Sequence, residues 1–342
     1  MKNSENLEVS HPPDPKAGGP VFIVGMNGSG TTMLLDCLNN HPQLYGFPLE
    51  TKILPLYLKK LGKYGDLADD ANFKRLWDDL RDIIYFRATN GGTPPPLPPD
   101  WAAREHTFAA ALDGIFRHFA KTEGKSRWCE KSPMYALHME DFGREFPDAK
   151  FIHVIRDGRD CAHSFRRRWH YTPQKTMHRW KSVVRKARAS GAKLGDRYIE
   201  VRYEDLTDAP VENMRRICAF LGAPYSEAVL TIGRPRSDQK TLAATIVPNK
   251  EKWRKGFTAR EVEVLDRIGG ALLANLGYPT TSPDSDWNPP KPTLKYWGYR
   301  DNFRRAANSI WTMIVTPDWR RRRMMFDKLV TNIRHKTNVG FQ

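Results

Sequence analysis

Short apolar runs alternate with amphipathic stretches along the chain, and this pattern predicts alternating strands and helices. The stretches that we interpret as strands are 20–25, 44–46, 127–131, 150–155 and 198–203. Apolar residues recur at helical spacing over 53–62, 70–88, 101–121, 134–146, 175–192 and 210–221, and directly after the strands at 20–25 and 150–155. Strands that alternate with helices predict an α/β fold, with a parallel β-sheet flanked by helices and right-handed crossovers.

Stretches rich in proline and glycine mark the irregular parts of the chain. Residues 90–99 predict a stiff surface loop. Residues 1–19 are polar, lack the apolar core of a signal peptide, and predict a disordered N-terminal segment. The prolines at 289–292 mark a break before an arginine-rich end. We therefore expect one globular domain over 20–280 and a basic helical C-terminal extension over 281–342.

The extension carries Arg304, Arg305 and four consecutive arginines at 320–323 among Trp, Met and Phe residues. Two interpretations stay open. The extension lies on anionic lipid or grips an acidic substrate, or it is a helical appendage that packs its aromatic residues on the domain and leaves its arginines in water.

Charge and cysteine usage narrow the class of protein. The 342 residues contain 55 Lys and Arg against 39 Asp and Glu, so the net charge of +16 favours an anionic ligand, an acidic macromolecule or a membrane surface. We expect no nucleic-acid partner, because no recognised nucleic-acid motif is present. The four cysteines have no metal-binding spacing, and no apolar run is long enough to span a bilayer. We expect no metal site, reduced buried thiols and a cytoplasmic protein.

A glycine-rich turn joins the first strand to the next helix. Four residues separate Gly25 from Gly30, as in the triphosphate loop G-x-x-x-x-G-K-[ST], but Thr31 replaces the lysine that contacts the β- and γ-phosphates. Free N–H groups and the positive end of a helix dipole favour an anion here, so we predict a site for a phosphate without a triphosphate tail. The alternative is an ordinary turn whose glycines only allow close packing. The residues that we expect to contact the phosphate are Asn27, Gly28, Ser29, Gly30, Thr31 and Thr32.

Two further basic elements would meet a second anionic group. Arg156 follows the strand at 150–155, and Ser164 is eight residues further on, a spacing that returns to one face of a helix. A guanidinium and a hydroxyl suit a phosphate, although Arg156 could instead pair with a nearby aspartate. The third element is Lys250-Glu251-Lys252-Trp253-Arg254-Lys255-Gly256, where a glycine beside cations lets the backbone approach an anion. The glycine-rich turn and these two basic elements together predict a binding site for a nucleotide with two separate anionic groups.

This combination resembles the sulfotransferases that use 3′-phosphoadenosine-5′-phosphosulfate (PAPS), over about residues 20–278. Ser29-Gly30-Thr31-Thr32 is similar to their 5′-phosphosulfate loop, and the segment 151–164 to their 3′-phosphate strand and helix. Arg254-Lys255-Gly256 matches a segment that closes over the 3′-phosphate in cytosolic members. Tyr203 falls where the family has a strand end that contacts adenine. The resemblance implies the P-loop NTPase-like sulfotransferase fold, PAPS as co-substrate and an acceptor that carries a hydroxyl group.

The chain is most similar to Golgi-type and bacterial members that act on tyrosylproteins and carbohydrates. Glu50-Thr51-Lys52 matches the position of their general base, and Glu130-Lys131-Ser132-Pro133 the segment whose lysine meets the sulfuryl group. The resemblance thus implies transfer of a sulfuryl group to a carbohydrate, lipid or peptide hydroxyl, with Glu50 as base and Lys131 and Lys52 as cations.

One position departs from the family pattern. Family members usually carry Arg or Lys before Ser-Gly-Thr-Thr, whereas this chain has Gly28. The loss of such a cation costs a few kcal/mol of barrier, so Lys52 or Lys131 compensates or activity falls. Two other functions stay open: a nucleotide- or acidic-polymer-binding protein without activity, and a P-loop kinase, although the kinase lysine is missing.

Overall fold

The computed structural model describes residues 18–52, 54–233 and 244–315. These residues form two compact units. The first extends to Asp157 and resumes over Ser182–Lys250, and the second comprises Gly158–Lys181 and the chain from Glu251 onward. Residues 1–17 of the expected N-terminal segment lie outside the described residues, as do residues 316–342 of the expected extension, with the arginines at 320–323. The expected boundary at residue 280 stays a prediction.

The first unit contains a five-stranded sheet in the order β2-β3-β1-β4-β5, in which every pair is parallel. Its strands are β1 (Val21–Gly25), β2 (Leu44–Gly46), β3 (Arg127–Lys131), β4 (Lys150–Ile155) and β5 (Tyr198–Arg202). All five expected strands and the α/β class are therefore confirmed. The last expected strand is one residue shorter, because Tyr203 already begins a helix.

The helices lie between these strands as expected, but several boundaries differ. Those of the first unit are α1 (Thr31–Asn39), α2 (Leu54–Lys59), α3 (Asp70–Arg81), α4 (Ile84–Thr89), α5 (Phe108–Thr122), α6 (Met139–Glu145), α9 (Tyr203–Asp208) and α10 (Pro210–Leu221). The helix expected from residue 101 begins at Phe108, because the Thr107 side chain accepts a hydrogen bond from the Ala110 N–H and caps it there. The helix expected over 134–146 begins as a 3₁₀ turn, Pro133–Leu137.

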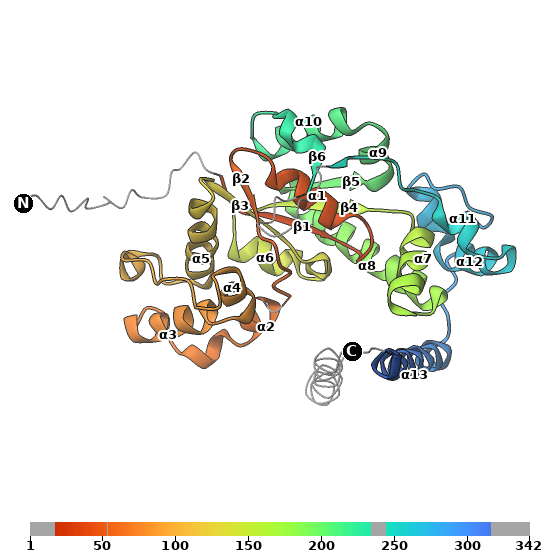
Figure 1. Cartoon of the computed structure of the whole chain (residues 1–342), viewed down its shortest axis with the longest axis horizontal. Coiled ribbons are helices and arrows are strands. Elements are labelled where there is room, and N and C mark those ends of the chain that lie inside the picture. Colours follow the sequence, from red (N-terminus) through yellow and green to blue (C-terminus); the bar gives the residue numbers. More distant parts are fainter. Residues whose placement is uncertain (1–17, 53, 234–243, 316–342) are drawn as a thin grey trace, which may run out of the picture. The chain divides into compact units, whose positions relative to one another are not determined.

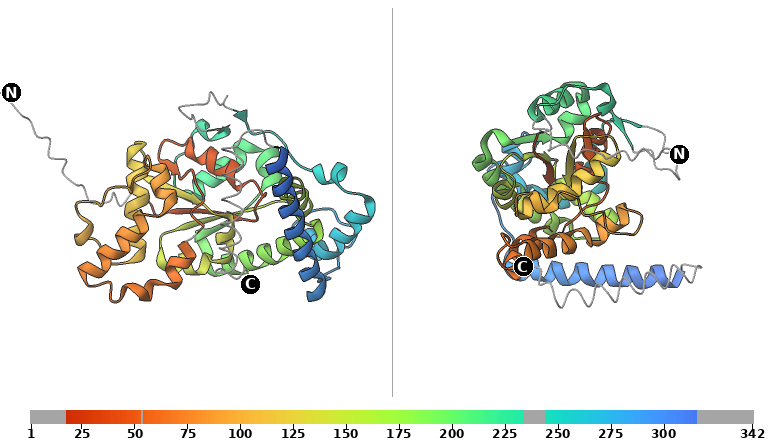
Figure 2. Two further views of the ribbon diagram at one scale, coloured as in Figure 1. Left: turned by 60° about the horizontal axis from the view of Figure 1, so that its bottom comes forward. Right: turned by 90° about the vertical axis from the view of Figure 1, so that its left-hand side faces the viewer.

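The second unit is helical in the part of the chain that the structure describes. It holds α7 (Gly158–Trp169), the first half of α8 (Pro173–Leu194), α11 (Lys252–Gly256), α12 (Ala259–Asn275) and α13 (Lys291–Val315). We did not predict α12, nor the small antiparallel pair β6 (Thr231–Ile232) and β7 (Ala244–Thr245) of the first unit. Figure 2 shows α13 as one long uninterrupted helix. None of the described helices is both long and apolar enough to cross a membrane.

The core of the first unit explains why the sheet is covered on both faces. Val21 and Ile23 point to one side of β1 and pack in a cluster with α1 and α10. Phe22 points to the other side, where it stacks on Phe142 of α6 and on Phe151. Figure 1 shows α1 and α10 on one side of the sheet and α6 on the other. The four cysteines are buried free thiols, as expected. The covered sheet leaves the strand ends as the place for chemistry.

Candidate active site

The parallel strands of the first unit all end at one edge of the sheet. Each strand end carries residues that we predicted to bind the nucleotide or to take part in catalysis. The glycine-rich loop 26–30 follows β1, and Arg156 follows β4. Lys131 is the last residue of β3, Glu50 lies four residues after β2, and Tyr203 comes directly after β5. Ligands of open parallel sheets bind beyond the carboxyl ends of the strands. The order β3-β1-β4 therefore places Lys131, the loop and Arg156 side by side at that edge.

The glycine-rich loop has the backbone of an anion site. Gly30 has φ +100° and is the N-cap of α1, yet no side chain caps this helix. The first N–H groups of an α-helix have no partner within the helix, so they can bind an anion. The Ser29 hydroxyl is buried and has no hydrogen-bond partner among the described residues. The loop therefore fits a phosphate group, which would satisfy both the backbone and this hydroxyl.

Gly28, which stands where family members usually carry Arg or Lys, adopts a backbone conformation that favours glycine. Gly28 has φ +88°, a conformation that a residue with a Cβ adopts only with strain. Its carbonyl oxygen accepts a hydrogen bond from Arg156 Nη1 at 3.2 Å. Arg156 follows the neighbouring strand β4, and its guanidinium thus lies against this loop.

Arg156 is held in place by aromatic and backbone contacts. It is 8% exposed, and its Nη2 donates to the Asn249 carbonyl at 2.5 Å. Its guanidinium lies 4.3 Å from the centre of the Tyr203 ring, a cation–π contact. A Cβ at Gly30 would lie only 2.3 Å from that ring. Tyr203 therefore packs between the glycine loop and Arg156 and fixes their spacing, while its contact with adenine stays a prediction.

Arg156 and Ser164 do not share a helix face, contrary to our prediction. Arg156 precedes the start of α7 at Gly158, so the eight-residue spacing is not helical throughout. Ser164 belongs to α7 in the second unit, and its place in a phosphate site stays a prediction.

The segment Arg254-Lys255-Gly256 forms most of the short helix α11 in the second unit. Asp160 of α7 holds its start by accepting from the N–H groups of Glu251 at 2.8 Å and Trp253 at 3.0 Å. The Arg254 side chain pairs with Glu251 at 2.9 Å and is half exposed. Gly256 lies against His163, since a Cβ would come within 2.3 Å of that ring. The anion contact that we expect from this segment stays a prediction.

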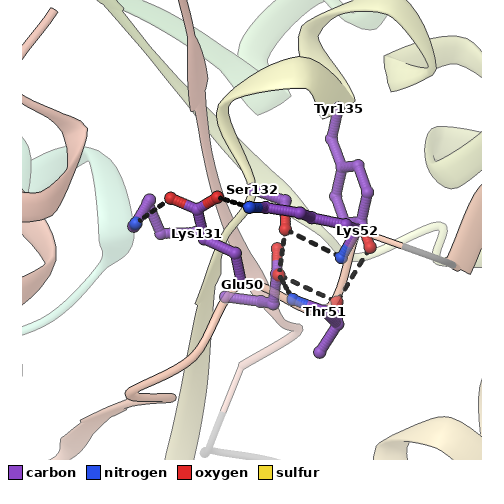
Figure 3. A network of polar contacts seen from close by, with 7 residues as sticks. Glu50, Thr51, Lys52, Lys131, Ser132 and Tyr135 are labelled. Atoms are coloured by element: carbon purple, nitrogen blue, oxygen red, sulfur yellow. Dashed lines mark hydrogen bonds and ion pairs between the residues drawn. The ribbon is translucent and has the colours of Figure 1, made fainter. Parts of the chain in front are cut away.

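Glu50 sits between the two selected lysines of the first unit (Figure 3). Lys131 Nζ is 2.5 Å from Glu50 Oε1, and Lys52 Nζ is 3.0 Å from Glu50 Oε2. Lys131 is nearly buried, with 8% of its side chain exposed, whereas Lys52 is 61% exposed. Burial alone would raise the pKa of Glu50, but hydrogen bonds and charge from Lys131, and then Lys52, outweigh it, so the pKa is lowered. The Glu50 carboxylate is thus ion-paired with both lysines, and its role as general base stays a prediction.

Glu130 positions this group, and we did not select it from the sequence. Its Oε1 accepts from the Thr51 hydroxyl at 2.9 Å, the Thr51 N–H at 3.2 Å and the Ser132 hydroxyl at 2.6 Å. Ser132 Oγ in turn accepts from the Lys52 N–H at 3.3 Å, and the Tyr135 hydroxyl bonds Thr51 Oγ1 at 2.8 Å. Figure 3 shows this network beside the Glu50 ion pairs. Glu130 therefore ties the segment that carries Glu50 to the end of β3.

The network also explains the backbone of Lys52, which has φ +50°, a rare value for a residue other than glycine. Strain of this kind persists only where the surroundings hold it, and here the bonds of Thr51 to Glu130 and of the Lys52 N–H to Ser132 hold the backbone up to Lys52. A signal for Glu130 was present: a carboxylate inside a strand of a two-sided parallel sheet must be buried, so it needs polar partners.

We expect Glu130→Gln to change how stability depends on pH. Burial raises the pKa of Glu130 to about 7 against the opposing hydrogen bonds of Ser132 and Thr51. A raised folded-state pKa gives stability that is present below the unfolded value near 4.5 and is lost as pH rises through 7. The unfolding free energy of the glutamine variant minus that of the parent should therefore rise by about 2 to 3 kcal/mol between pH 5 and pH 8.

Urea unfolding at several pH values measures this difference. Glu105→Gln is the matched control, because Glu105 is exposed, and its difference should stay flat. A flat difference for Glu130→Gln as well would show that the Glu130 carboxyl is already ionised in the folded protein at pH 5.

The site has the character of an anion-binding site. Among the described residues, no group of three or more His, Cys, Asp or Glu side chains could hold a metal ion. The loop, Arg156, Lys131 and Lys52 supply N–H donors and cations at one sheet edge.

Comparison with known proteins agrees with this chemistry. Residues 20–227 match the model of the sulfotransferase family. The chain is 25% identical over 309 residues to protein-tyrosine sulfotransferase 1 of Danio rerio, covering 84% of this chain and 79% of that protein. It is 24% identical over 293 residues to the nodulation protein NoeE of Sinorhizobium fredii, covering 75% and 65%.

Among solved structures, the sulfotransferase domain of the Synechococcus PCC 7002 olefin synthase is similar, with 24% identity and a TM-score of 0.49. That match covers 78% of this chain and 98% of that one. The family match spans the glycine-rich loop, Glu50, Lys131, Arg156 and Tyr203, and decides between the sulfotransferase and the kinase. The chain belongs to the sulfotransferase family and is a sulfotransferase enzyme.

Proposed function

We propose that this enzyme transfers the sulfuryl group of PAPS to the hydroxyl group of an acceptor, with Glu50 as general base. One observation carries the proposal: Glu50 lies between Lys131 and Lys52 at the sheet edge that also holds the glycine-rich loop. A carboxylate and two cations beside an anion site supply a base and charge stabilisation for the transfer of an anionic group.

The two phosphates of PAPS would bind to different parts of the edge. The N–H groups of the loop, with the hydroxyls of Ser29, Thr31 and Thr32, suit the 5′-phosphate. Arg156 suits the 3′-phosphate, because its planar guanidinium can bind two phosphate oxygens at once. We assign Tyr203 to the adenine side of the site, and the nucleotide contacts that the family resemblance implies for Ser164 and Arg254-Lys255-Gly256 stay predictions.

The reaction we propose is an in-line displacement at sulfur. The acceptor oxygen forms a bond to sulfur as the bond between sulfur and the 5′-phosphate oxygen breaks. Glu50 takes the proton of the acceptor hydroxyl, and the products are a sulfate ester and 3′-phosphoadenosine 5′-phosphate. Lys131, with help from Lys52, stabilises the negative charge on the sulfuryl oxygens. The two lysines would thereby replace the cation that family members carry at the position of Gly28.

The ion pairs of Glu50 would couple the binding of the nucleotide to the strength of the base. With both lysines on Glu50, the lowered pKa makes the carboxylate a weak base. When the lysines turn their charge to the sulfuryl group, the pKa of Glu50 rises toward its ordinary value, and the carboxylate becomes a better proton acceptor. The base is then strongest when the donor is bound.

For the acceptor we propose a hydroxyl of a peptide, carbohydrate or lipid. The names of the relatives from Danio rerio and Drosophila melanogaster favour testing a tyrosine peptide first. The loop at 90–99, with its run of prolines, is one stretch where acceptor specificity could reside.

The experiment is incubation of the purified chain with ³⁵S-labelled PAPS and a panel of acceptors: an acidic tyrosine peptide, an oligosaccharide, a phenol and a lipid alcohol. We expect label on one class of acceptor, and the matching peptide with phenylalanine in place of tyrosine controls for the hydroxyl. Binding of 3′-phosphoadenosine 5′-phosphate without transfer to any acceptor would support the binding protein without activity. Transfer from γ-labelled ATP instead would contradict the choice of PAPS.

A further inference from the structure

A polar contact group fixes how α13 is rotated within the second unit. Asp301 is buried, and its Oδ1 accepts from the Thr172 N–H at 2.8 Å and from the Thr172 hydroxyl at 2.5 Å. Arg300 donates to Thr172 Oγ1 at 3.0 Å, and Arg305 donates to the Tyr171 hydroxyl at 2.9 Å. The side of α13 that carries Asp301 therefore faces the link between α7 and α8.

The other side of α13 exposes large aromatic side chains. Tyr296 is 60% exposed, Tyr299 and Phe303 are each 74% exposed, and Trp311 is 64% exposed. At about 100° per residue these four fall within an arc of about 120° that excludes Asp301. Scattered surface aromatics need no explanation, but four on one helical face form an apolar stripe that indicates a binding surface.

Positive charge borders this aromatic stripe. Between residues 291 and 311 the sequence contains Lys291, Lys295, Arg300, Arg304 and Arg305, and its one carboxylate is the buried Asp301. Lys291, Lys295 and Arg304 are exposed. The exposed part of this helix segment thus combines aromatic side chains with cations and presents no negative charge.

A surface groove lies beside the stripe and contains two lysines, Lys295 of α13 and Lys175 of α8. It has a volume of about 340 Å³ and is lined by Lys175, Leu294, Lys295, Gly298, Tyr299 and Asn302. Gly298 makes room for Lys175, since a Cβ there would lie 3.0 Å from Lys175 Nζ. Lys175 Nζ also lies 3.8 Å from Asp301 Oδ2, so Lys295 supplies the unshared charge. The two ammonium groups with the polar groups of Tyr299 and Asn302 suit one phosphate group. Tyr299 belongs to both the groove and the stripe.

We propose that this face of α13 binds the surface of a membrane that contains anionic phospholipids. The aromatic side chains enter the boundary between headgroups and acyl chains, where Trp and Tyr are favoured. Lys295 and Arg304, which flank the aromatic arc, contact the headgroups, and the groove accepts one headgroup phosphate. The chain would lie on the membrane through α13 without crossing it.

Charge argues against the other occupants of this face. A two-fold dimer through the stripe would place each basic helix against its own copy, so the like charges would repel. Proteins that bind single-stranded nucleic acid stack bases along a positively charged groove. Here three of the four aromatics lie on the exposed helix surface outside the groove.

Flotation of the full-length protein with vesicles tests the proposal. We expect binding to vesicles of phosphatidylcholine with about 30% phosphatidylglycerol at 0.1 M salt, little binding to pure phosphatidylcholine, and weaker binding at 0.5 M salt. Each cation near an anionic surface raises the partition coefficient about fivefold. The double variant Lys175→Gln/Lys295→Gln should therefore lower the partition coefficient about 30-fold. The double variant Tyr299→Ala/Phe303→Ala should lower it at least about 10-fold.

Matched controls are Lys59→Gln/Lys60→Gln for charge and Ile84→Ala for an exposed apolar side chain, both in the first unit. These should bind as the parent does, and circular dichroism shows whether each variant is folded. Equal binding to both kinds of vesicle, absence of binding, or equal losses in the controls would each overturn the proposal. Self-association or RNA binding that Tyr299→Ala/Phe303→Ala removes, without vesicle binding, would assign the face to that partner instead.

Discussion

Replacing Glu50 with glutamine should abolish sulfuryl transfer, with a loss of at least about 10³-fold in kcat, because the amide cannot take the acceptor proton. Glutamine keeps the shape of the side chain, and its single amide oxygen can still accept a hydrogen bond from Lys131. The affinity for 3′-phosphoadenosine 5′-phosphate should therefore stay within about threefold of the parent. Transfer assays with labelled PAPS and calorimetric titration of the product nucleotide measure the two effects separately.

The exposed Glu123 provides a matched control for this change, and Glu123→Gln should transfer at the parent rate. Equal turnover by Glu50→Gln would remove Glu50 from the mechanism. A parallel loss of nucleotide binding would instead indicate that Glu50 only keeps the two lysines in place.

Replacing Lys131 with methionine should lower kcat by about 10² to 10³-fold, the usual cost of removing a donor that stabilises developing charge. The variant keeps most of the volume of the nearly buried side chain and removes its charge. It also removes the nearest partner of Glu50, so the pKa of Glu50 rises. Because a base must be deprotonated to act, the acid limb of the pH profile of kcat/KM should move to higher pH.

Lys52→Met is the matched comparison, since Lys52 also pairs with Glu50 but is largely exposed. We expect a loss of less than about 10-fold and a smaller shift of the acid limb, because solvent screens an exposed ion pair. An unchanged acid limb in Lys131→Met would contradict the role of Glu50 as the titrating base. A larger loss in Lys52→Met than in Lys131→Met would reverse the roles of the two lysines.

The strands and the glycine-rich turn after β1 could be predicted because local sequence determines them. The apolar residues of β1 and β4 predict buried strands by themselves, and Gly28 and Gly30 meet a backbone requirement that few other residues satisfy. Once the strands were known to be parallel, their carboxyl ends had to meet at one edge. The shared location of Lys131, Arg156 and the loop follows from this.

Other features depend on contacts between distant residues, which local patterns do not contain. The role of Glu130 rests on Thr51, nearly eighty positions away, and on Tyr135. The start of α7 at Gly158 leaves Arg156 outside the helix and removes the shared face assumed for Ser164. The Asp160 carboxylate bonds the start of α11, 91 residues further along the chain, and no local sequence pattern predicts that contact.

The central claim is that the loop after β1 and Arg156 after β4 bind one doubly phosphorylated adenosine. A crystal structure of the chain with 3′-phosphoadenosine 5′-phosphate tests it most directly. We expect the 5′-phosphate on the N–H groups of the loop and the Thr32 hydroxyl, and the 3′-phosphate on the Arg156 guanidinium of the same molecule. A nucleotide bound elsewhere, or one that contacts the loop while its 3′-phosphate lies away from Arg156, would contradict the account.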